Sequence, residues 1–242
     1  MENERYARQI LMPQIGEQGQ KKLSRSSALV VGCGGLGSTL LLNLCGMGVG
    51  RIGFCDGDVV SRSNLNRQFL HTPRDIGRQK AQSAYEKLSA FAPELTLEPY
   101  SFYLTKENAQ DIVGLYDVVV LAVDSLPARL VVNEACVSKR VTLVDGGING
   151  LHGTLLTVRP GKTACLHCLY GDVPPPLGAV ASFAPVASMV SAMQAQAAAN
   201  ILLGLDNPSD GTMILLDGAQ LTTERVRVRR REDCPVCSKL HN

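Results

Sequence analysis

The chain has 242 residues, of which 45% are hydrophobic and 19% charged, and its formal net charge at pH 7 is +2. This length is enough for one or two domains with a sizeable core, and the apolar fraction is too high for intrinsic disorder. The near-neutral charge excludes the strong positive field that binds nucleic acid or anionic membranes by bulk charge, so neither partner is expected. The chain begins with the charged stretch MENERY, which lacks a signal-peptide pattern and predicts a reducing, cytoplasmic location.

Short apolar runs alternate with helical patterns through the first half of the chain. Strands are expected at 28–31, 51–55, 95–100, 117–122 and 141–144, and helices at 36–47, 79–91, 106–113 and 129–138. This alternation predicts an α/β, Rossmann-like fold, in which a mostly parallel sheet carries helices on both faces. Ligands of such folds bind at the carboxyl ends of the strands.

The second half has a different pattern, with antiparallel strands expected at 152–158, 212–216 and 221–229. Between them, 173–205 has no charged residue, but its prolines and amides are atypical of a bilayer span. A stripe of apolar residues from Val186 to Ile201 instead indicates a buried helix. No linker divides the chain, so we expect a single domain over 1–242, with a nucleotide-binding half at about 1–145 and an antiparallel, cysteine-bearing half at about 146–242.

A glycine-rich loop follows the first expected strand and opens a helix. Its sequence GCGGLG matches the pattern G-x-G-x-x-G, in which backbone N–H groups approach a phosphate at a helix N-terminus. Asp56 ends the next strand, where a carboxylate can accept hydrogen bonds from ribose hydroxyls. Together these features predict a nucleotide site that includes Gly32, Gly34, Gly35, Gly37 and Asp56.

Polar and basic residues beyond Asp56 favour a triphosphate. The segment SNLNRQ at 63–68 and Lys80 bring amides and cations to the same crevice, where opposite charges attract strongly. Asp124 ends a later strand and can either hold Mg²⁺ or cap the helix that leads to Arg129. For each basic residue taken alone, a solvated loop is the alternative interpretation.

The 8 cysteines fall into two sets. Two C-x-x-C pairs have the ligand pattern of a closed, structural Zn²⁺ site, with a redox pair as the rival interpretation: Cys165, Cys168, Cys234 and Cys237. The other set lies in the expected strands and helices and is predicted to be buried: Cys33, Cys45, Cys55 and Cys136. Cys33 is the member worth testing as reactive, because a helix N-terminus lowers the pKa of a thiol.

In combination these motifs resemble the ThiF/MoeB/HesA family, the bacterial relatives of ubiquitin-activating enzymes. The resemblance covers nearly the whole chain and includes RYARQ at the N-terminus, the glycine loop, SNLNRQ, Asp124 with Arg129, and both C-x-x-C pairs. It implies an ATP-dependent adenylyltransferase that acts on the C-terminal Gly-Gly carboxylate of a ubiquitin-like sulfur-carrier protein and releases pyrophosphate. The product pathway would be that of a sulfur-containing compound such as thiamin or molybdopterin. The resemblance also implies Mg²⁺, bound zinc and a homodimer.

The resemblance assigns roles to individual residues. The catalytic set would be Arg67, Lys80, Asp124 and Arg8, with Asp124 on Mg²⁺ and Arg8 reaching into the partner subunit's active site. The nucleotide set would comprise the glycine loop, Asp56, Ser63, Asn64, Leu65, Asn66, Arg67, Lys80, Asp124 and Ser125, and Ser125 stands where many relatives have asparagine. The metal set would be the four cysteines of the C-x-x-C pairs.

One departure from the family pattern concerns covalent chemistry. Several relatives carry a cysteine after the first C-x-x-C pair that bonds covalently to the carrier, but 169–233 contains none. We therefore expect the reaction to stop at the acyl-adenylate. A non-catalytic, zinc-containing nucleotide-binding scaffold and an NAD-dependent oxidoreductase are the alternative functions. The arginine-rich stretch 225–231 is expected to be an edge strand.

Overall fold

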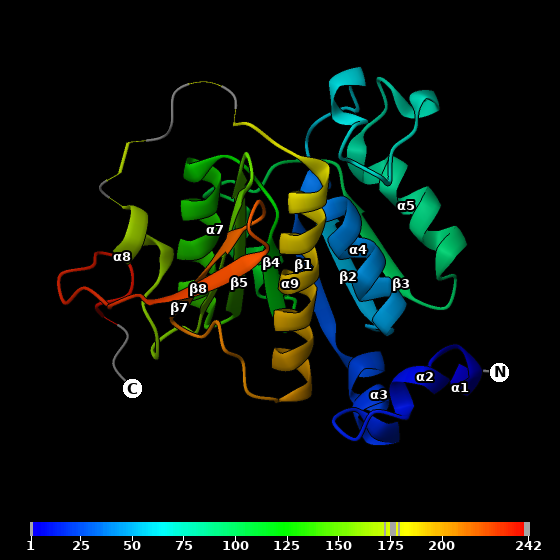
Figure 1. Cartoon of the computed structure of the whole chain (residues 1–242), viewed down its shortest axis with the longest axis horizontal. Helices are drawn as coiled ribbons and strands as arrows, with labels where there is room; N and C mark the ends of the chain where they lie inside the picture. The colour runs from blue at the N-terminus through cyan, green and yellow to red at the C-terminus, as the bar shows by residue number, and fades with distance from the viewer. Residues whose placement is uncertain (1, 172, 175–177, 179, 240–242) are drawn as a thin grey trace.

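The computed structural model describes residues 2–171, 173, 174, 178 and 180–239. Its centre is an 8-stranded sheet with the order β3-β2-β1-β4-β5-β6-β7-β8 (Figure 1). The strands are β1 (Ser27–Val31), β2 (Arg51–Cys55), β3 (Thr96–Tyr100), β4 (Val118–Leu121), β5 (Thr142–Asn149), β6 (His152–Val158), β7 (Thr212–Asp217) and β8 (Thr222–Arg227).

The sheet changes character along β5. Strands β3, β2, β1, β4 and β5 are mutually parallel, whereas β6 pairs antiparallel with β5, β7 with β6, and β8 with β7. The strand order reverses at β1, whose two neighbours are β2 and β4. A reversal of this kind leaves a crevice at the carboxyl ends of the strands, so the topology places a ligand site above β1 and β4. The predicted parallel sheet with an antiparallel extension is confirmed.

Helices cover both faces of this sheet. They are α1 (Glu2–Arg5), α2 (Ala7–Ile10), α3 (Gly16–Arg25), α4 (Gly35–Met47), α5 (Lys80–Phe91), α6 (Ala109–Val113), α7 (Leu126–Lys139), α8 (Leu166–Tyr170) and α9 (Ala184–Leu203). Alternate residues of the strands point into two cores: α4, α5 and α9 close one, and α6, α7 and α8 close the other. In Figure 1, α4 and α9 lie in front of the sheet.

Among the described residues, α9 is the one helix long and apolar enough to cross a membrane by length and composition. It packs instead against α4, β5 and β6. Its buried polar groups find partners there, because the Ser191 hydroxyl donates to the Leu36 carbonyl at 2.7 Å and the Gln194 amide donates to the Leu121 carbonyl. The buried helix expected from the apolar stripe is confirmed.

Two element boundaries differ from expectation for physical reasons. α7 begins at Leu126, three residues earlier than predicted, because Ser125 caps it and Pro127 occupies its first turn. β5 runs through Gly146 and Gly147 to Asn149, five residues beyond the end of the strand expected at 141–144. These glycines lie inside the sheet because a side chain at either position would collide with Gln194 or Arg129.

Candidate functional site

A cavity of about 380 Å³ opens at the carboxyl ends of the parallel strands, where the strand order reverses. It brings together eight of the predicted residues: Gly32, Gly34, Gly35, Asp56, Arg67, Lys80, Asp124 and Ser125. Asp58, Phe102 and Tyr103, which the sequence did not single out, also line it, together with Gln68 from the segment SNLNRQ and Arg129. The site is therefore assembled from segments that are widely separated in the chain.

The glycine loop connects β1 to α4 and supplies one wall of the cavity. Gly32 has a φ of 103°, a left-handed conformation that favours glycine, and a Cβ there would lie 2.6 Å from the Ala122 carbonyl oxygen. Gly37 does not line the cavity. A Cβ at Gly37 would overlap the Gly32 carbonyl, so this glycine allows α4 to pack closely against the loop. Gly32, Gly34 and Gly35 are the loop glycines that line the cavity.

Asp56 is 8% exposed and lies beneath the glycine loop. Its Oδ2 accepts the backbone N–H of Cys33 at 2.8 Å, and its Oδ1 accepts that of Asp58 at 2.9 Å. Burial raises the pKa of Asp56, while Lys80 and the two backbone N–H groups oppose that shift. Each carboxylate oxygen can accept a second hydrogen bond, so Asp56 both holds the loop and can meet a ribose hydroxyl.

Lys80 is the first residue of α5, and its side chain is 8% exposed. Its ammonium lies 2.8 Å from Oδ2 of Asp58, while the Tyr103 hydroxyl donates to Oδ1 of the same carboxylate. Burial works to raise the pKa of Asp58, but the hydrogen bonds from Lys80 and Tyr103 outweigh it and lower the pKa. The Asp-x-Asp spacing from Asp56 is the sequence signal that identifies Asp58; nothing comparable marks Tyr103.

Arg67 is held by the segment that precedes it. Its guanidinium donates to the Ser63 carbonyl at 2.9 Å and to Oδ1 of Asn66 at 3.0 Å. The Asn64 side chain accepts the backbone N–H of Ser61 at 3.1 Å and closes a short 3₁₀ turn at Arg62–Asn64. The cavity lining does not include Ser63, Asn64, Leu65 or Asn66. The structure thus places Ser63, Asn64 and Asn66 around Arg67, whereas the resemblance to the family assigned them to the nucleotide itself.

Gln68, from the same segment, is 4% exposed and does line the cavity. Among the described residues, its Oε1 has no hydrogen-bond partner although it is buried. A buried acceptor without a partner costs free energy, so this oxygen is suited to accept a hydrogen bond from a ligand.

Asp124 is exposed at the end of β4, beside the N-terminus of α7. The cap of α7 is Ser125, whose hydroxyl accepts the Ala128 N–H at 3.5 Å, so the alternative capping role considered for Asp124 is wrong. Among the described residues the Asp124 carboxylate has no partner, and Asp124 lines the cavity. Arg129, one turn into α7, forms a buried ion pair with Asp145 at 3.2 Å.

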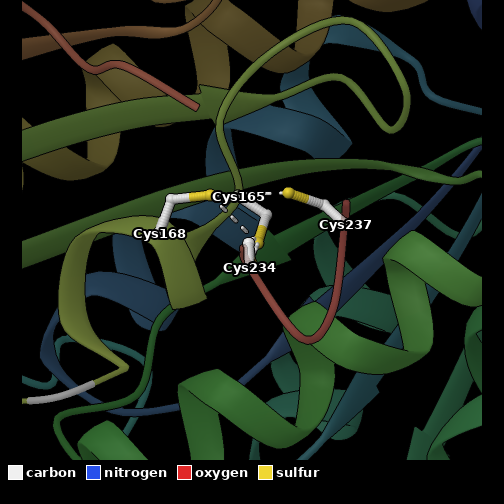
Figure 2. Close-up of side chains that lie close together, drawn as sticks. All are labelled: Cys165, Cys168, Cys234 and Cys237. Carbon is white, nitrogen blue, oxygen red and sulfur yellow. Dashed lines mark hydrogen bonds between the residues drawn. The ribbon is translucent and has the colours of Figure 1, made fainter. Parts of the chain in front are cut away.

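The four cysteines of the C-x-x-C pairs form one cluster, far from the glycine loop in sequence (Figure 2). All four Sγ atoms lie within 4.8 Å of one another, with Cys168 and Cys237 at 3.4 Å and Cys165 and Cys234 at 3.8 Å. A tetrahedral ion with Zn–S bonds of about 2.3 Å requires S–S separations of about 3.8 Å. The four thiols therefore fit one Zn²⁺ ion, and the pairing of both motifs in one cluster disfavours two separate redox sites.

The remaining four cysteines are buried, as predicted: Cys33, Cys45, Cys55 and Cys136. The suggestion that Cys33 has an activated thiol is wrong. Its side chain is fully buried, and burial raises its pKa well above the usual range, with Asp56 adding to the shift. Desolvation at this position outweighs the helix N-terminus.

Arg8 lies on α2, exposed and outside the residues that line the cavity. The neighbouring side chains anchor this region: Tyr6 donates to Glu94 at 3.0 Å, and Arg5 forms an ion pair with Glu94 at 3.2 Å. Within one chain, Arg8 does not join the other predicted catalytic residues.

The ThiF family model matches residues 6–236. The chain belongs to the ThiF family. It is 40% identical to the sulfur carrier protein adenylyltransferase of Thermus thermophilus, covering 98% of this chain and 91% of that protein. It is 36% identical to the SAMP-activating enzyme E1 of Haloferax volcanii, covering 98% of this chain and 89% of that protein.

Some relatives are much longer than this chain. The adenylyltransferase and sulfurtransferase MOCS3 of Aedes aegypti is 38% identical over 97% of this chain, which spans 55% of that relative. Among solved structures, Escherichia coli MccB with ATP superposes with a TM-score of 0.86 at 23% identity, covering 97% of this chain and 75% of MccB. At that identity the likeness shows the fold.

Proposed function

We propose that this chain uses MgATP to adenylate the C-terminal carboxylate of a ubiquitin-like sulfur-carrier protein that ends in Gly-Gly. The observation that carries the proposal is the convergence of Arg67, Lys80 and Asp124 with the glycine loop on one cavity. The names of the relatives, a sulfur carrier protein adenylyltransferase and an activating enzyme E1, support the same reaction.

The chemistry matches this inventory of side chains. A carboxylate that attacks the α-phosphorus is already ionised, so the reaction needs little acid–base help. It does need neutralisation of the phosphate charges and an in-line arrangement of nucleophile and leaving group. Arg67 and Lys80 supply fixed positive charge at the cavity wall, and the N–H groups of the glycine loop supply donors.

Lys80 has to exchange partners when the nucleotide binds. In this structure its ammonium is paired with Asp58, whose side chain is 52% exposed. A polyphosphate carries more charge than one carboxylate and attracts the buried ammonium more strongly. We infer that Asp58 holds Lys80 in place before ATP arrives and then releases it to the phosphates.

Asp124 is the residue we assign to Mg²⁺. Mg²⁺ is usually held by one or two carboxylates together with substrate phosphates, and the free Asp124 carboxylate at the cavity wall fits that pattern. Bound Mg²⁺ would neutralise phosphate charge. Asp56 is assigned to accept a hydrogen bond from a ribose hydroxyl, and Oε1 of Gln68 is assigned to accept one from a donor group of the nucleotide.

The cysteine cluster is assigned to a structural Zn²⁺ ion. With four thiolates the coordination shell is closed, so the ion has no position for a substrate. Its role would be to fasten the C-terminal segment that carries Cys234 and Cys237 to the start of α8 at Cys165 and Cys168.

The reaction is proposed to stop at the acyl-adenylate. Residues 169–233 contain no cysteine, and the cysteines outside the cluster are buried. A carrier adduct at a protein cysteine that dithiothreitol releases would contradict this proposal. Sulfur transfer would then be the task of another protein.

Arg8 and the homodimer belong to the same proposal. Arg8 is exposed on α2, as a residue must be if it is to enter a second subunit's cavity. We place the protein in the cytoplasm as a homodimer in which each subunit contributes Arg8 to the other.

ATP–pyrophosphate exchange tests the proposed function. Labelled pyrophosphate should enter ATP in the presence of a carrier that ends in Gly-Gly, and not with the same carrier lacking that dipeptide. Nucleotide binding without exchange would favour the non-catalytic scaffold. Calorimetric titration with NAD and with ATP distinguishes the oxidoreductase alternative from the adenylyltransferase, because an oxidoreductase should bind NAD more tightly than ATP.

A further inference from the structure

A buried chain of hydrogen bonds leads from α5 to the glycine loop without entering the cavity. Nε2 of His71 lies 3.0 Å from the carbonyl oxygen of Cys33, and Nδ1 lies 2.9 Å from the Ser83 hydroxyl. The Lys87 ammonium lies 2.7 Å from the same hydroxyl and 2.6 Å from Asp75. The side chains of His71, Ser83 and Asp75 are buried, and Lys87 is half-buried.

The chemistry of these groups limits where the hydrogens can lie. A carbonyl oxygen only accepts, so Nε2 of His71 carries the proton and donates to Cys33. An ammonium only donates, so Lys87 gives a hydrogen to the Ser83 oxygen, and the Ser83 hydroxyl can then donate to Nδ1 of a neutral ring or accept from Nδ1 of an imidazolium. The positive charge of Lys87 on the Nδ1 side of the ring disfavours the imidazolium and favours the neutral ring, protonated on Nε2. Its burial, which lowers the pKa of His71, favours the same form.

The anchored carbonyl controls a group that does face the cavity. In a trans peptide the C=O of one residue and the N–H of the next point in opposite directions. When His71 holds the Cys33 carbonyl on its own side, the N–H of Gly34 points to the other side, and Gly34 lines the cavity whereas His71 does not. Asp56 holds the preceding peptide through the Cys33 N–H. Both peptides next to Cys33 are thus clamped by side chains, in a loop whose glycines would otherwise leave it free to rotate.

We propose that His71 is a positioning residue, which aims the Gly34 N–H at the phosphates of the bound nucleotide by anchoring the Cys33 carbonyl. Ser83, Lys87 and Asp75 fix the tautomer that this anchoring requires. The inference rests on the proposed function, because it needs a polyphosphate in the cavity. It concerns residues that touch no ligand and act only through the loop.

Calorimetric titration of the purified protein with ATP and with adenosine tests the inference. His71→Leu replaces the imidazole with an apolar side chain of moderate size that has no donor. We expect this variant to bind ATP about tenfold more weakly, which corresponds to the loss of one hydrogen bond to a charged ligand. Adenosine has no phosphate, so its affinity should change by less than about twofold. His71→Gln, whose amide can donate to Cys33 and accept from Ser83, should restore ATP binding to within about threefold.

Ser209→Ala is the matched control. Ser209 is also buried and shares a hydrogen bond of 2.7 Å with Thr157, but it lies outside the cavity lining and outside this chain of hydrogen bonds. Both affinities should match the unmodified protein. If His71→Leu binds ATP normally, or loses ATP and adenosine equally, the positioning role is overturned. If the unmodified protein itself fails to bind ATP, the proposed function fails instead.

A second measurement keeps the inference testable if His71→Leu does not fold. The ¹⁵N chemical shifts of the imidazole nitrogens identify the protonated nitrogen in the unmodified protein without any nucleotide. The arrangement described above requires protonation at Nε2 with Nδ1 unprotonated. A neutral ring protonated at Nδ1 would overturn it, because such a ring cannot donate to Cys33.

Discussion

The nucleotide cavity and the cysteine cluster share no residue, and they differ in how they are built. The cavity draws single residues from many segments, and polar groups such as Gln68 and Asp124 have free hydrogen-bonding capacity within the part of the chain that the structure describes. The cluster draws on two short motifs, and its four thiols already face one another (Figure 2). A site that acts on ligands keeps unsatisfied groups, whereas a site that holds the fold together satisfies its own. Damage to the first should reduce function, and damage to the second should reduce stability.

The largest expected effect is the loss of stability when the proposed Zn²⁺ is removed from the cluster. Structural zinc sites contribute about 10 kcal/mol, so treatment with a strong chelator should unfold the protein or lower its melting temperature steeply. Calorimetry alongside measurement of zinc content checks this. Cys234→Ser should lose the metal, while Cys136→Ala, in the core but outside the cluster, should keep it. Purified protein without zinc would contradict the assignment.

Arg67→Ala should have the next largest effect, on activity alone. We expect ATP–pyrophosphate exchange to fall by about 10²–10³-fold, as when one charge-stabilising donor is removed from an active site. Arg67 has hydrogen bonds to its own loop and is not a core residue, so the melting temperature should stay within about 2 °C. Arg62→Ala, in the same loop but outside the cavity lining, is the control and should retain exchange. Normal exchange by Arg67→Ala would remove Arg67 from the catalytic set.

Asp75→Asn tests how the network behind the cavity depends on pH. Burial works to raise the pKa of Asp75, but hydrogen bonds from Lys87 and Thr72 hold it far below its usual value. A depressed pKa stabilises the fold above the unfolded value of about 3.9 and loses that contribution as the pH falls toward the folded value. The variant should cost about 2 kcal/mol in urea unfolding, constant from pH 8 to pH 5.5, and the difference should shrink below about pH 4. A difference that grows in acid would contradict the ion pair with Lys87.

Asp58→Asn should have the smallest effect, and it should strengthen ATP binding rather than weaken it. Asp58 competes with the phosphates for Lys80, so its neutralisation should strengthen ATP binding by about threefold. The fold should lose about 1 kcal/mol because the buried ammonium loses its partner. Calorimetric titration and urea unfolding measure the two effects. Weaker ATP binding would show that Asp58 orients Lys80 in the bound state as well.

Much of the fold and half of the site follow from the sequence because their signals are local. The apolar runs predicted the strands of the sheet, and the apolar stripe predicted α9. The C-x-x-C pairs and the glycine loop were recognisable from their spacing alone. Gly146 and Gly147 were not recognisable as part of β5, because the reason for glycine there is the approach of Gln194 and Arg129 from other elements.

The residues that the sequence missed act through tertiary contacts. Tyr103 matters only because its loop brings it to Asp58, and His71 only because α5 brings Ser83 to one side of it and the glycine loop to the other. The resemblance to the family assigned Ser63, Asn64 and Asn66 to the nucleotide, while their hydrogen bonds in the structure are to their own loop. Arg8 stays a prediction that depends on a second subunit.

Intact mass spectrometry of the carrier tests the central claim most directly. A ubiquitin-like carrier that ends in Gly-Gly is incubated with this protein, MgATP and pyrophosphatase, and its mass is compared with that of the same carrier lacking the terminal dipeptide. We predict that the full-length carrier gains one adenylyl group, that the truncated carrier gains none, and that Arg67→Ala slows the gain by about 10²–10³-fold. A carrier that keeps its original mass, while the unmodified protein still binds ATP, would contradict adenylation.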